Sequence, residues 1–166
     1  MSRPSTRWAR ITSQVIACAM LTTGAPAQSP IVGTAKVIDG DTIEINLQRI
    51  RLFGIDAFET EQTCGNYYAG KAAADYLVTT IRNPVRCWPE GRSYGRIVAI
   101  CVDAHGKDIA QAMVSAGHAL ADTTYSLRYA DDARSARTRG VGAHTQNCKT
   151  PWAWRRYREA PTPLRR

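Results

Sequence analysis

Two acidic residues lie close to the ends of neighbouring strand-like segments, where they could hold a cation together. Asp41 belongs to the turn-like stretch Asp39-Gly40-Asp41-Thr42, and Asp56 follows the segment RIRLFGI. If the adjacent strands pair, the two carboxylates converge, and with a backbone carbonyl they would bind a hard cation such as calcium. A calcium hand is excluded, because no bidentate Glu follows at the required spacing. Since Asp-Gly alone is most often a hairpin turn, the metal hypothesis depends on the neighbouring residues.

Two arginines and a glutamate could act on an anion held by that cation. Arg51 and Arg96 belong to different strand-like segments, and each offers a planar fork of donors to the oxygens of a phosphate. Glu59 follows Asp56 closely and could orient or deprotonate a water molecule. The simpler alternative is a set of surface ion pairs, because 22% of the residues are charged. The combination favours metal-assisted chemistry at a phosphate.

The segments that must position these residues show alternating strand and helix patterns. β-Branched and apolar residues broken by turns predict strands at 31–38, 42–47, 49–53, 84–88 and 96–102. Apolar residues at three- and four-residue spacing predict helices at 66–81, 108–117 and 127–139. We expect Asp108 to cap the second helix and Gly140 to end the third.

This order of elements predicts an α+β fold in a single domain. The expected sheet has about five strands, and closing it would protect its edges. We therefore expect a five-stranded, OB-like β-barrel with about three packed helices. A chain of 166 residues fits one such core with a leader and a tail.

The first 27 residues have the pattern of a secretory signal peptide. Three arginines and no acid precede an apolar run at 11–25, and Ala25-Pro26-Ala27 resembles a cleavage site. A membrane span is disfavoured because polar residues interrupt the short run. A lipoprotein box ending at Cys18 ranks lower still. We expect 1–27 to be the leader, and a secreted or periplasmic product without a membrane anchor.

Four cysteines remain after such cleavage, which suits two disulfides in an oxidising compartment. Cys87 and Cys101 flank a turn-like GRSYGR segment and could face each other across an antiparallel pair. Cys64 then pairs with Cys148 by elimination. A zinc site is the alternative, but no CxxC spacing is present and the histidines are scattered.

The positive charge is concentrated at the C-terminal end. Residues 28–148 contain 13 basic and 13 acidic residues, whereas 149–166 contain six basic residues and one acid. This tail also carries Trp152, Trp154 and Tyr157. Such a segment could contact phosphates and stack on bases, or it could be a solvated terminus with an aromatic anchor. We expect a domain at 28–148 and a separate basic tail at 149–166.

Four stretches between residues 37 and 140 resemble, in order and spacing, the staphylococcal nuclease (thermonuclease) family. They are VIDGDTIEI, RIRLFGIDAFE, RSYGRIVAICV and GKDIAQAMVSAGHAL. The resemblance implies an OB-like barrel with helices and calcium-dependent hydrolysis of DNA or RNA that leaves 3′-phosphate ends. The PWAWRR segment also resembles the tail of secreted members.

The family's functional residues can be carried over to matching positions. The resemblance implies calcium ligands at Asp41 and Asp56 and at the backbone carbonyl of Ala57. It also implies phosphate-binding arginines at Arg51 and Arg96. The catalytic glutamate corresponds to Glu59, and a substrate-side tyrosine corresponds to Tyr94.

The sequence departs from the family pattern near this glutamate. Phe58 replaces the usual proline, which would leave the backbone freer and place a bulky apolar side chain beside the site. Ala57 replaces a frequent threonine but keeps the carbonyl. An aromatic residue expected after Gly140 is also missing, and Trp152 or Trp154 could substitute for it.

The sequence therefore predicts a monomeric, secreted or periplasmic, calcium-dependent nuclease with low sequence selectivity. Nothing in the sequence resembles a base-reading helix or a zinc finger. The alternative is a catalytically weak or inactive OB-fold module that binds nucleic acid. A purely structural secreted domain would neither bind nor cleave.

Overall fold

The computed structural model describes residues 29–159, so the predicted leader at 1–27 lies outside the described residues. Six strands form one mixed sheet in the order β1-β6-β7-β4-β3-β2, and β5 and β8 form a small second sheet. The bounds of the large sheet are β1 Ile31–Gly33, β2 Lys36–Val37, β3 Thr42–Ile45, β4 Gln48–Leu52, β6 Val85–Ser93 and β7 Arg96–Val102. The small sheet consists of β5 Ile55–Ala57 and β8 Ala119–Ala121.

The predicted strands are present, but their bounds and number differ from those expected. The expected first strand, 31–38, is split into β1 and β2, because the backbone N–H of Ala35 donates to the side chain of Asn83 at 2.8 Å instead of continuing the ladder. Its second half pairs with β3. The register of β6 and β7 matches the predicted antiparallel pair and places Cys87 opposite Cys101.

The predicted closed five-stranded barrel is replaced by an open sheet. Across residues 29–159, no ladder joins the outer strands β1 and β2. The centre of the sheet is the parallel pair of β4 and β7, with Arg51 opposite Val98. After β4, the chain turns at Gly54, which has φ of 73°, and leaves the large sheet to form β5. Residues 55–57, which follow this turn, form β5 and pair with β8 in the small sheet.

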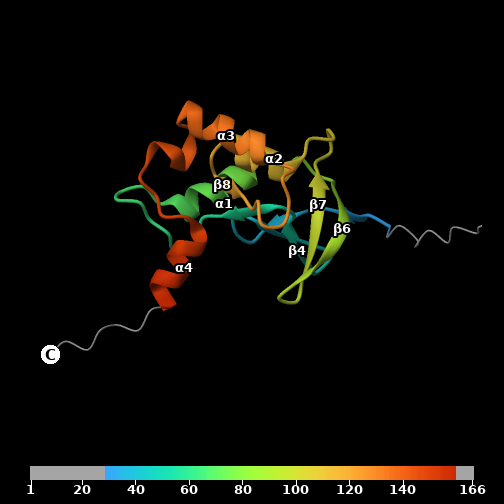
Figure 1. Cartoon of the computed structure of the whole chain (residues 1–166). Helices are drawn as coiled ribbons and strands as arrows, with labels where there is room; N and C mark the ends of the chain where they lie inside the picture. Colours follow the sequence, from blue (N-terminus) through green and yellow to red (C-terminus); the bar gives the residue numbers. More distant parts are fainter. Residues whose placement is uncertain (1–28, 160–166) are drawn as a thin grey trace, which may run out of the picture.

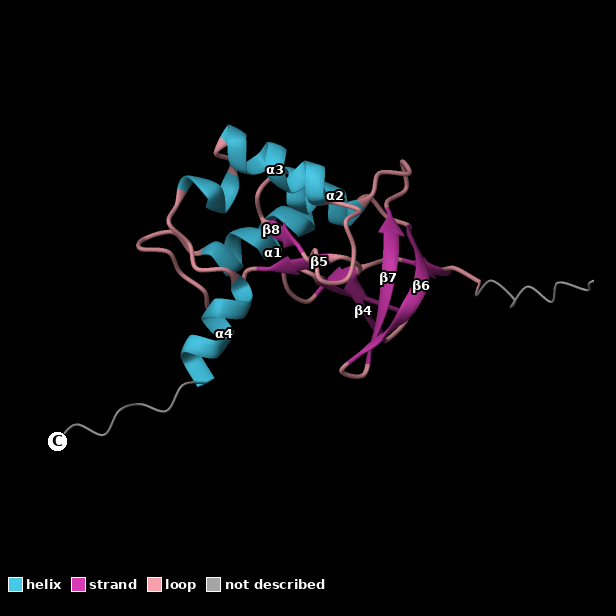
Figure 2. Cartoon of the chain, viewed as in Figure 1, coloured by secondary structure: helices cyan, strands magenta, loops and turns pink. Residues whose placement is uncertain are grey.

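Four α-helices are present in the described part of the chain, against about three expected. They are α1 Ala69–Thr80, α2 Ile109–Ser115, α3 Ala130–Arg139 and α4 Pro151–Glu159, with a short 3₁₀ helix, η1, at Gly142–Thr145. Asp108 caps α2 by accepting from the Gln111 N–H at 3.1 Å, and Gly140 ends α3 in the left-handed conformation, as predicted. The fourth helix lies in the segment expected to be a tail (Figures 1 and 2).

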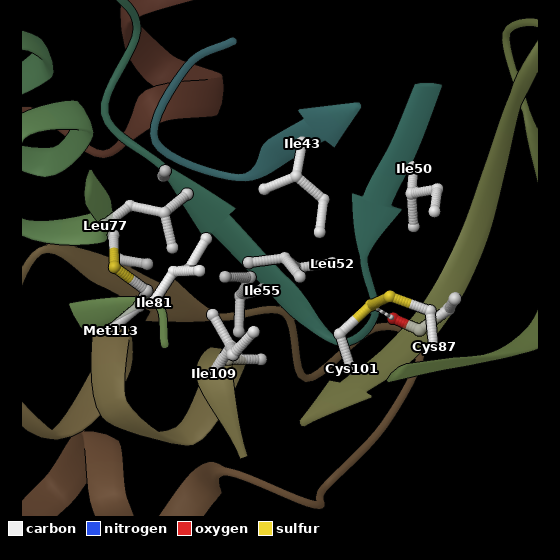
Figure 3. Close-up of a cluster of buried hydrophobic side chains, with 14 of the residues drawn as sticks. Ile43, Ile50, Leu52, Ile55, Leu77, Ile81, Cys87, Cys101, Ile109 and Met113 are labelled. Atoms are coloured by element: carbon white, nitrogen blue, oxygen red, sulfur yellow. Dashed lines mark hydrogen bonds between the residues drawn. A yellow bond between two sulfur atoms is a disulfide. The ribbon is translucent and has the colours of Figure 1, made fainter. Parts of the chain in front are cut away.

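The main core lies between the large sheet and the helices α1 and α2. Ile43, Ile50, Leu52 and Ile55 come from the strands, and the helices contribute residues such as Leu77 (Figure 3). All of these side chains are buried, as is the Cys87–Cys101 disulfide at the end of the same cluster. Helices α1, α2 and α3 gather on one side, whereas α4 stands apart from them (Figure 1). None of the helices at 29–159 is long and apolar enough to cross a membrane.

The second predicted disulfide, Cys64–Cys148, joins two distant loops with a Cα–Cα distance of 5.1 Å. It lies beside a small second cluster that contains Phe58, Ala69 and Ala143. Because this bond spans 84 residues, it constrains a large part of the unfolded chain. It ties the segment just before α4 to the loop that follows β5.

Helix α1 packs directly on that loop at Gly70. A Cβ atom at Gly70 would lie 1.8 Å from the carbonyl oxygen of Glu59, which is backbone and cannot move aside cheaply. Only glycine permits this approach. The start of α1 therefore fixes the position of the backbone at Glu59.

We expect Gly70→Ala to lower the free energy of unfolding by more than about 2 kcal/mol, because α1 and the loop must separate. Chemical denaturation measures the change. Gly91→Ala is the matched control, since no atom lies within 4 Å of its added Cβ. It should change stability by less than about 0.5 kcal/mol. Equal effects of the two substitutions would contradict the packing argument.

Candidate functional site

The predicted site residues come together where β3, β4 and β5 meet. Asp41 stands immediately before β3, whose Thr42 lies opposite Arg51 in β4. Asp56 is the middle residue of β5, which follows β4 after a turn. The backbone N–H of Leu52 also donates to the carbonyl oxygen of Asp41 at 2.8 Å. This pairing places the two carboxylates on either side of one arginine.

Arg51 bridges the two carboxylates. Its Nη1 lies 2.7 Å from Oδ2 of Asp41, and its Nη2 lies 3.2 Å from Oδ1 of Asp56. Nη2 also donates to the carbonyl oxygen of Ile55 at 3.1 Å. One guanidinium therefore reaches both acids, so they lie close enough together to share a single cation.

Asp41 is the most deeply buried charged group of this cluster, with its side chain 8% exposed. Burial raises its pKa from 3.8 to about 6, although Arg51 opposes the shift. The close ion pair alone would lower the pKa, so loss of hydration has the larger effect. The carboxylate also accepts from the Ala57 N–H at 3.3 Å and from the Thr42 hydroxyl at 3.0 Å. Its negative charge is thus only partly compensated by the protein.

Arg96 starts β7 on the opposite side of Thr42. Its guanidinium donates to the Thr42 hydroxyl at 3.2 Å and makes no ion pair within residues 29–159. Arg96 and Arg51 both line a cavity of about 860 Å³. The structure therefore brings together the two predicted phosphate-binding arginines, one paired and one with free donors.

Glu59 lies in the loop after β5 and is only partly buried. Its backbone N–H donates to the side chain of Gln62 at 3.2 Å. The buried Gln62 in turn donates to the carbonyl oxygen of Lys149 at 2.7 Å. Gln62 thereby links the loop of Glu59 to the residues before α4. No motif in the sequence points to Gln62.

Phe58 directly precedes Glu59 in the loop after β5. Its side chain is buried in the small cluster with Ala69 and Ala143, next to the Cys64–Cys148 disulfide. A large apolar side chain gains more free energy in this cluster than in the charged site. Phe58 therefore anchors the loop that presents Glu59.

Tyr94 is at the tip of the β6–β7 hairpin, where its backbone has φ of 48°. Its side chain is 97% exposed and lines the same cavity as Arg51 and Arg96. Tyr125 and Trp152 line this cavity as well. Another cavity, of about 610 Å³, lies near Ile31 and contains none of the predicted site residues.

Arg155 also contacts the site, although it was not among the predicted site residues. It lies in α4, and its guanidinium contacts both oxygens of Asp56, at 3.1 Å for Nη1–Oδ1 and 2.9 Å for Nη2–Oδ2. Nη1 also donates to Oε1 of Glu59. The hydrogen bonds to Asp56 raise the pKa of Arg155, partial burial acts in the opposite direction, and Glu59 adds to the rise. The signals in the sequence were the charge excess of the tail and the resemblance of PWAWRR to the tail of secreted family members.

The remainder of α4 combines an anchor with exposed charge. Pro151 is buried and Trp154 half-buried, and the rings of Trp154 and Tyr157 lie 6.4 Å apart. Trp152 is exposed and lies under the guanidinium of Arg156, 4.3 Å from the ring centroid. The expected basic tail is therefore a docked helix as far as Glu159.

The donors present at the site suit a hard cation. Asp41 and Asp56 supply carboxylate oxygens, which calcium prefers, and two arginines already bind there as cations. Burial raises the pKa of Asp41 even beside Arg51, and a further positive charge nearby would favour its ionised form. Within the described residues, no group of three or more His, Cys, Asp or Glu side chains is arranged to hold a metal ion. Two carboxylates would thus need backbone or water oxygens to complete the coordination.

Comparison with known proteins supports the resemblance found in the sequence. The model of the family described as staphylococcal nuclease homologue matches residues 49–143. The chain is also 38% identical over 142 residues to the succinoglycan biosynthesis protein ExoI of Rhizobium meliloti (strain 1021). That similarity covers 80% of this chain and 74% of the relative. The family match includes Arg51, Asp56, Glu59 and Arg96 but ends before Arg155.

We expect Asp41→Asn to stabilise the metal-free protein at neutral pH but not in acid. Because the folded pKa of about 6 exceeds the ordinary value of 3.8, the folded state binds the Asp41 proton more tightly than the unfolded state. The stability gained from this tighter proton binding is fully present below pH 3.8 and is lost as the pH rises to about 6. Asparagine stays neutral at every pH, so it should add about 2 to 3 kcal/mol above pH 7.

Urea denaturation in the presence of a chelator, at pH 4 and at pH 8, measures this difference. Asp75→Asn is the control, since the Asp75 carboxylate is exposed and pairs only with Lys71. It should have little effect at either pH. A loss of stability at pH 8 in Asp41→Asn would show that the ion pair with Arg51 outweighs the cost of burial.

Proposed function

Because the chain belongs to the family of staphylococcal nuclease homologues, we propose that it is a secreted or periplasmic, calcium-dependent nuclease. It hydrolyses DNA or RNA phosphodiesters with low sequence selectivity and leaves 3′-phosphate ends. The observation that carries this proposal is Arg51, which bridges Asp41 and Asp56 beside the cavity lined by Arg96. The carboxylates needed to hold a cation and the arginines needed to hold a phosphate are thus adjacent.

Each residue has a separate role in the proposed reaction. Asp41 and Asp56, with the backbone carbonyl of Ala57, hold calcium, which supplies positive charge to the phosphate. Arg51 and Arg96 donate to its non-bridging oxygens as negative charge develops there. Glu59 accepts a proton from the attacking water, whose oxygen bonds to phosphorus as the bond from phosphorus to the 5′-oxygen breaks, and the 5′-oxygen leaves with a proton from solvent. Tyr94 contacts the substrate from the tip of the β6–β7 hairpin.

Low sequence selectivity follows from the kinds of groups that line the cavity. Guanidinium groups bind phosphates, which are the same in every nucleotide, and aromatic rings stack on any base. Phosphate contacts also make binding sensitive to salt. The two disulfides support an oxidising compartment, consistent with a leader at 1–27. We take 28–148 as the nuclease domain of a monomer and 149–166 as an appended segment.

A second candidate function is a nucleic-acid-binding module without turnover. Arg155 favours it, because its guanidinium pairs with both Asp56 and Glu59 and so competes with a cation and a proton for them. ExoI is named for succinoglycan biosynthesis, so the biological role of this family need not be digestion of nucleic acid. Such a module would bind strands with no dependence on calcium.

Cleavage of single- and double-stranded DNA and RNA tests the first proposal. The protein is recovered with both disulfides from the periplasm or medium of an expressing bacterium and assayed with calcium or with chelator. We expect calcium-dependent cleavage that falls at least about 100-fold in Glu59→Ala and Arg96→Ala, since each loses a group that acts on the reacting phosphate.

Two control variants test whether the loss is specific. Glu61→Ala alters an exposed acid in the same loop, and Arg49→Ala alters an exposed arginine in the same strand as Arg51. Both should retain activity within about threefold, as expected for exposed positions. Strand binding without cleavage by the folded protein would favour the binding module. Full activity in Glu59→Ala would remove that residue from the proposed mechanism.

A further inference from the structure

Arg155 occupies the groups that the proposed nuclease reaction needs. Both oxygens of Asp56 accept from its guanidinium, and Oδ1 of Asp56 accepts from Arg51 as well. The same guanidinium holds an oxygen of Glu59. Asp56 is the residue nearest the centre of this network, since both arginines contact it. Arg155 would therefore compete with a calcium ion for the oxygens of Asp56.

Withdrawal of Arg155 is compatible with the way α4 is attached. The residues before α4 are fixed by the Cys64–Cys148 disulfide, by the bond from Gln62 to Lys149, and by burial of Pro151. The side chain of Arg155, by contrast, is 42% exposed. A long arginine side chain can therefore change its partner while the start of the helix stays in place.

The charge of the cavity depends on where Arg155 points. Besides the site residues, its lining includes the arginines Arg92 and Arg156 and the acids Glu90, Asp122 and Glu159. These charges nearly balance, so the free protein presents little net attraction for a polyanion at this place. Replacing Arg155 by calcium at Asp56 would add two positive charges to the cavity. The guanidinium of Arg155, which already lines the cavity, would then be free within it.

The neighbours of Arg155 on α4 provide a surface for a strand. Arg156 lies over the ring of Trp152, and both line the cavity together with Arg51 and Arg96. Within residues 29–159, Arg156 makes no ion pair with an acid. An indole and guanidinium groups on one helix suit a base and a phosphate of the same strand.

We propose that Arg155 is a third phosphate-binding residue that couples the binding of calcium to the binding of a nucleic-acid strand. In the free protein it holds Asp56 and Glu59. When calcium binds Asp56, Arg155 transfers to a phosphate of the strand next to the one held by Arg51 and Arg96. This inference rests on the proposed nuclease function for its substrate, but its test does not require cleavage.

Calcium titration calorimetry without nucleic acid is the first measurement. Arg155→Gln and Arg155→Ala remove the competing guanidinium and should bind calcium at least about tenfold more tightly than the wild type, a gain within the usual range of coupling between sites. Arg158→Gln is the matched control, because Arg158 lies on the same helix and pairs with Glu61, away from Asp56. Its calcium affinity should stay within about twofold of the wild type.

The second measurement is the affinity for a fluorescent, single-stranded phosphorothioate oligothymidylate, by anisotropy. With saturating calcium, Arg155→Gln should bind the strand about fivefold more weakly than the wild type, and the strand should enhance calcium affinity less. Arg155→Lys keeps the charge but lacks the planar fork, so its strand affinity should lie between those of the wild type and Arg155→Gln. Circular dichroism of each variant establishes that it is folded.

Equal or weaker calcium binding by Arg155→Gln and Arg155→Ala would overturn the proposal, because Arg155 would then position Asp56 rather than compete for it. If Arg155→Gln bound the strand as tightly as the wild type, the proposed transfer of Arg155 to a phosphate would be overturned. Absence of calcium binding in the wild type and in both variants would overturn it as well. Failure of the nuclease proposal has a different signature, which is normal calcium and strand binding without cleavage.

Discussion

The charge of the buried carboxylates Asp41 and Asp56 constrains how the strands around them are arranged. Burial makes the ionised form of Asp41 costly, and an isolated carboxylate at this depth would take up a proton. Arg51 keeps both groups partnered by reaching them from the strand between them. The pairing of β3 with β4 and the sharp turn into β5 are what bring the three side chains within reach of one another.

The rest of the molecule supports this arrangement through backbone contacts. Gly70 lets α1 approach the carbonyl of Glu59, and the buried Phe58 holds the same loop from the other side. Gln62 and the Cys64–Cys148 disulfide then connect this loop to the start of α4. Arg155 and Asp56 are 99 positions apart in the chain, so the position of Arg155 depends on packing between distant segments.

Features that follow from strand pairing or from the number of cysteines could be predicted from the sequence, and most other contacts between distant segments could not. Strand pairing places Arg51 between Asp41 and Asp56, and it places Cys87 opposite Cys101, so both features follow from local patterns. The split of the first strand depends on the side chain of Asn83, which no periodicity reveals. The pairing of β5 with β8 and the docking of α4 likewise depend on tertiary contacts. The departure from the family pattern at Phe58 does not by itself indicate where the new side chain packs.

The attachment of α4 makes it a separable part of the protein. Every residue of the main core lies before Gly140, and both disulfides are complete at Cys148. Proteolytic trimming within the segment from Lys149 to Arg155 would thus leave the scaffold and its covalent links unchanged while removing the guanidinium from Asp56 and Glu59. The charge at the centre of the site can in this way change through processing or through evolution of the C-terminus alone, without any substitution in the scaffold of the domain.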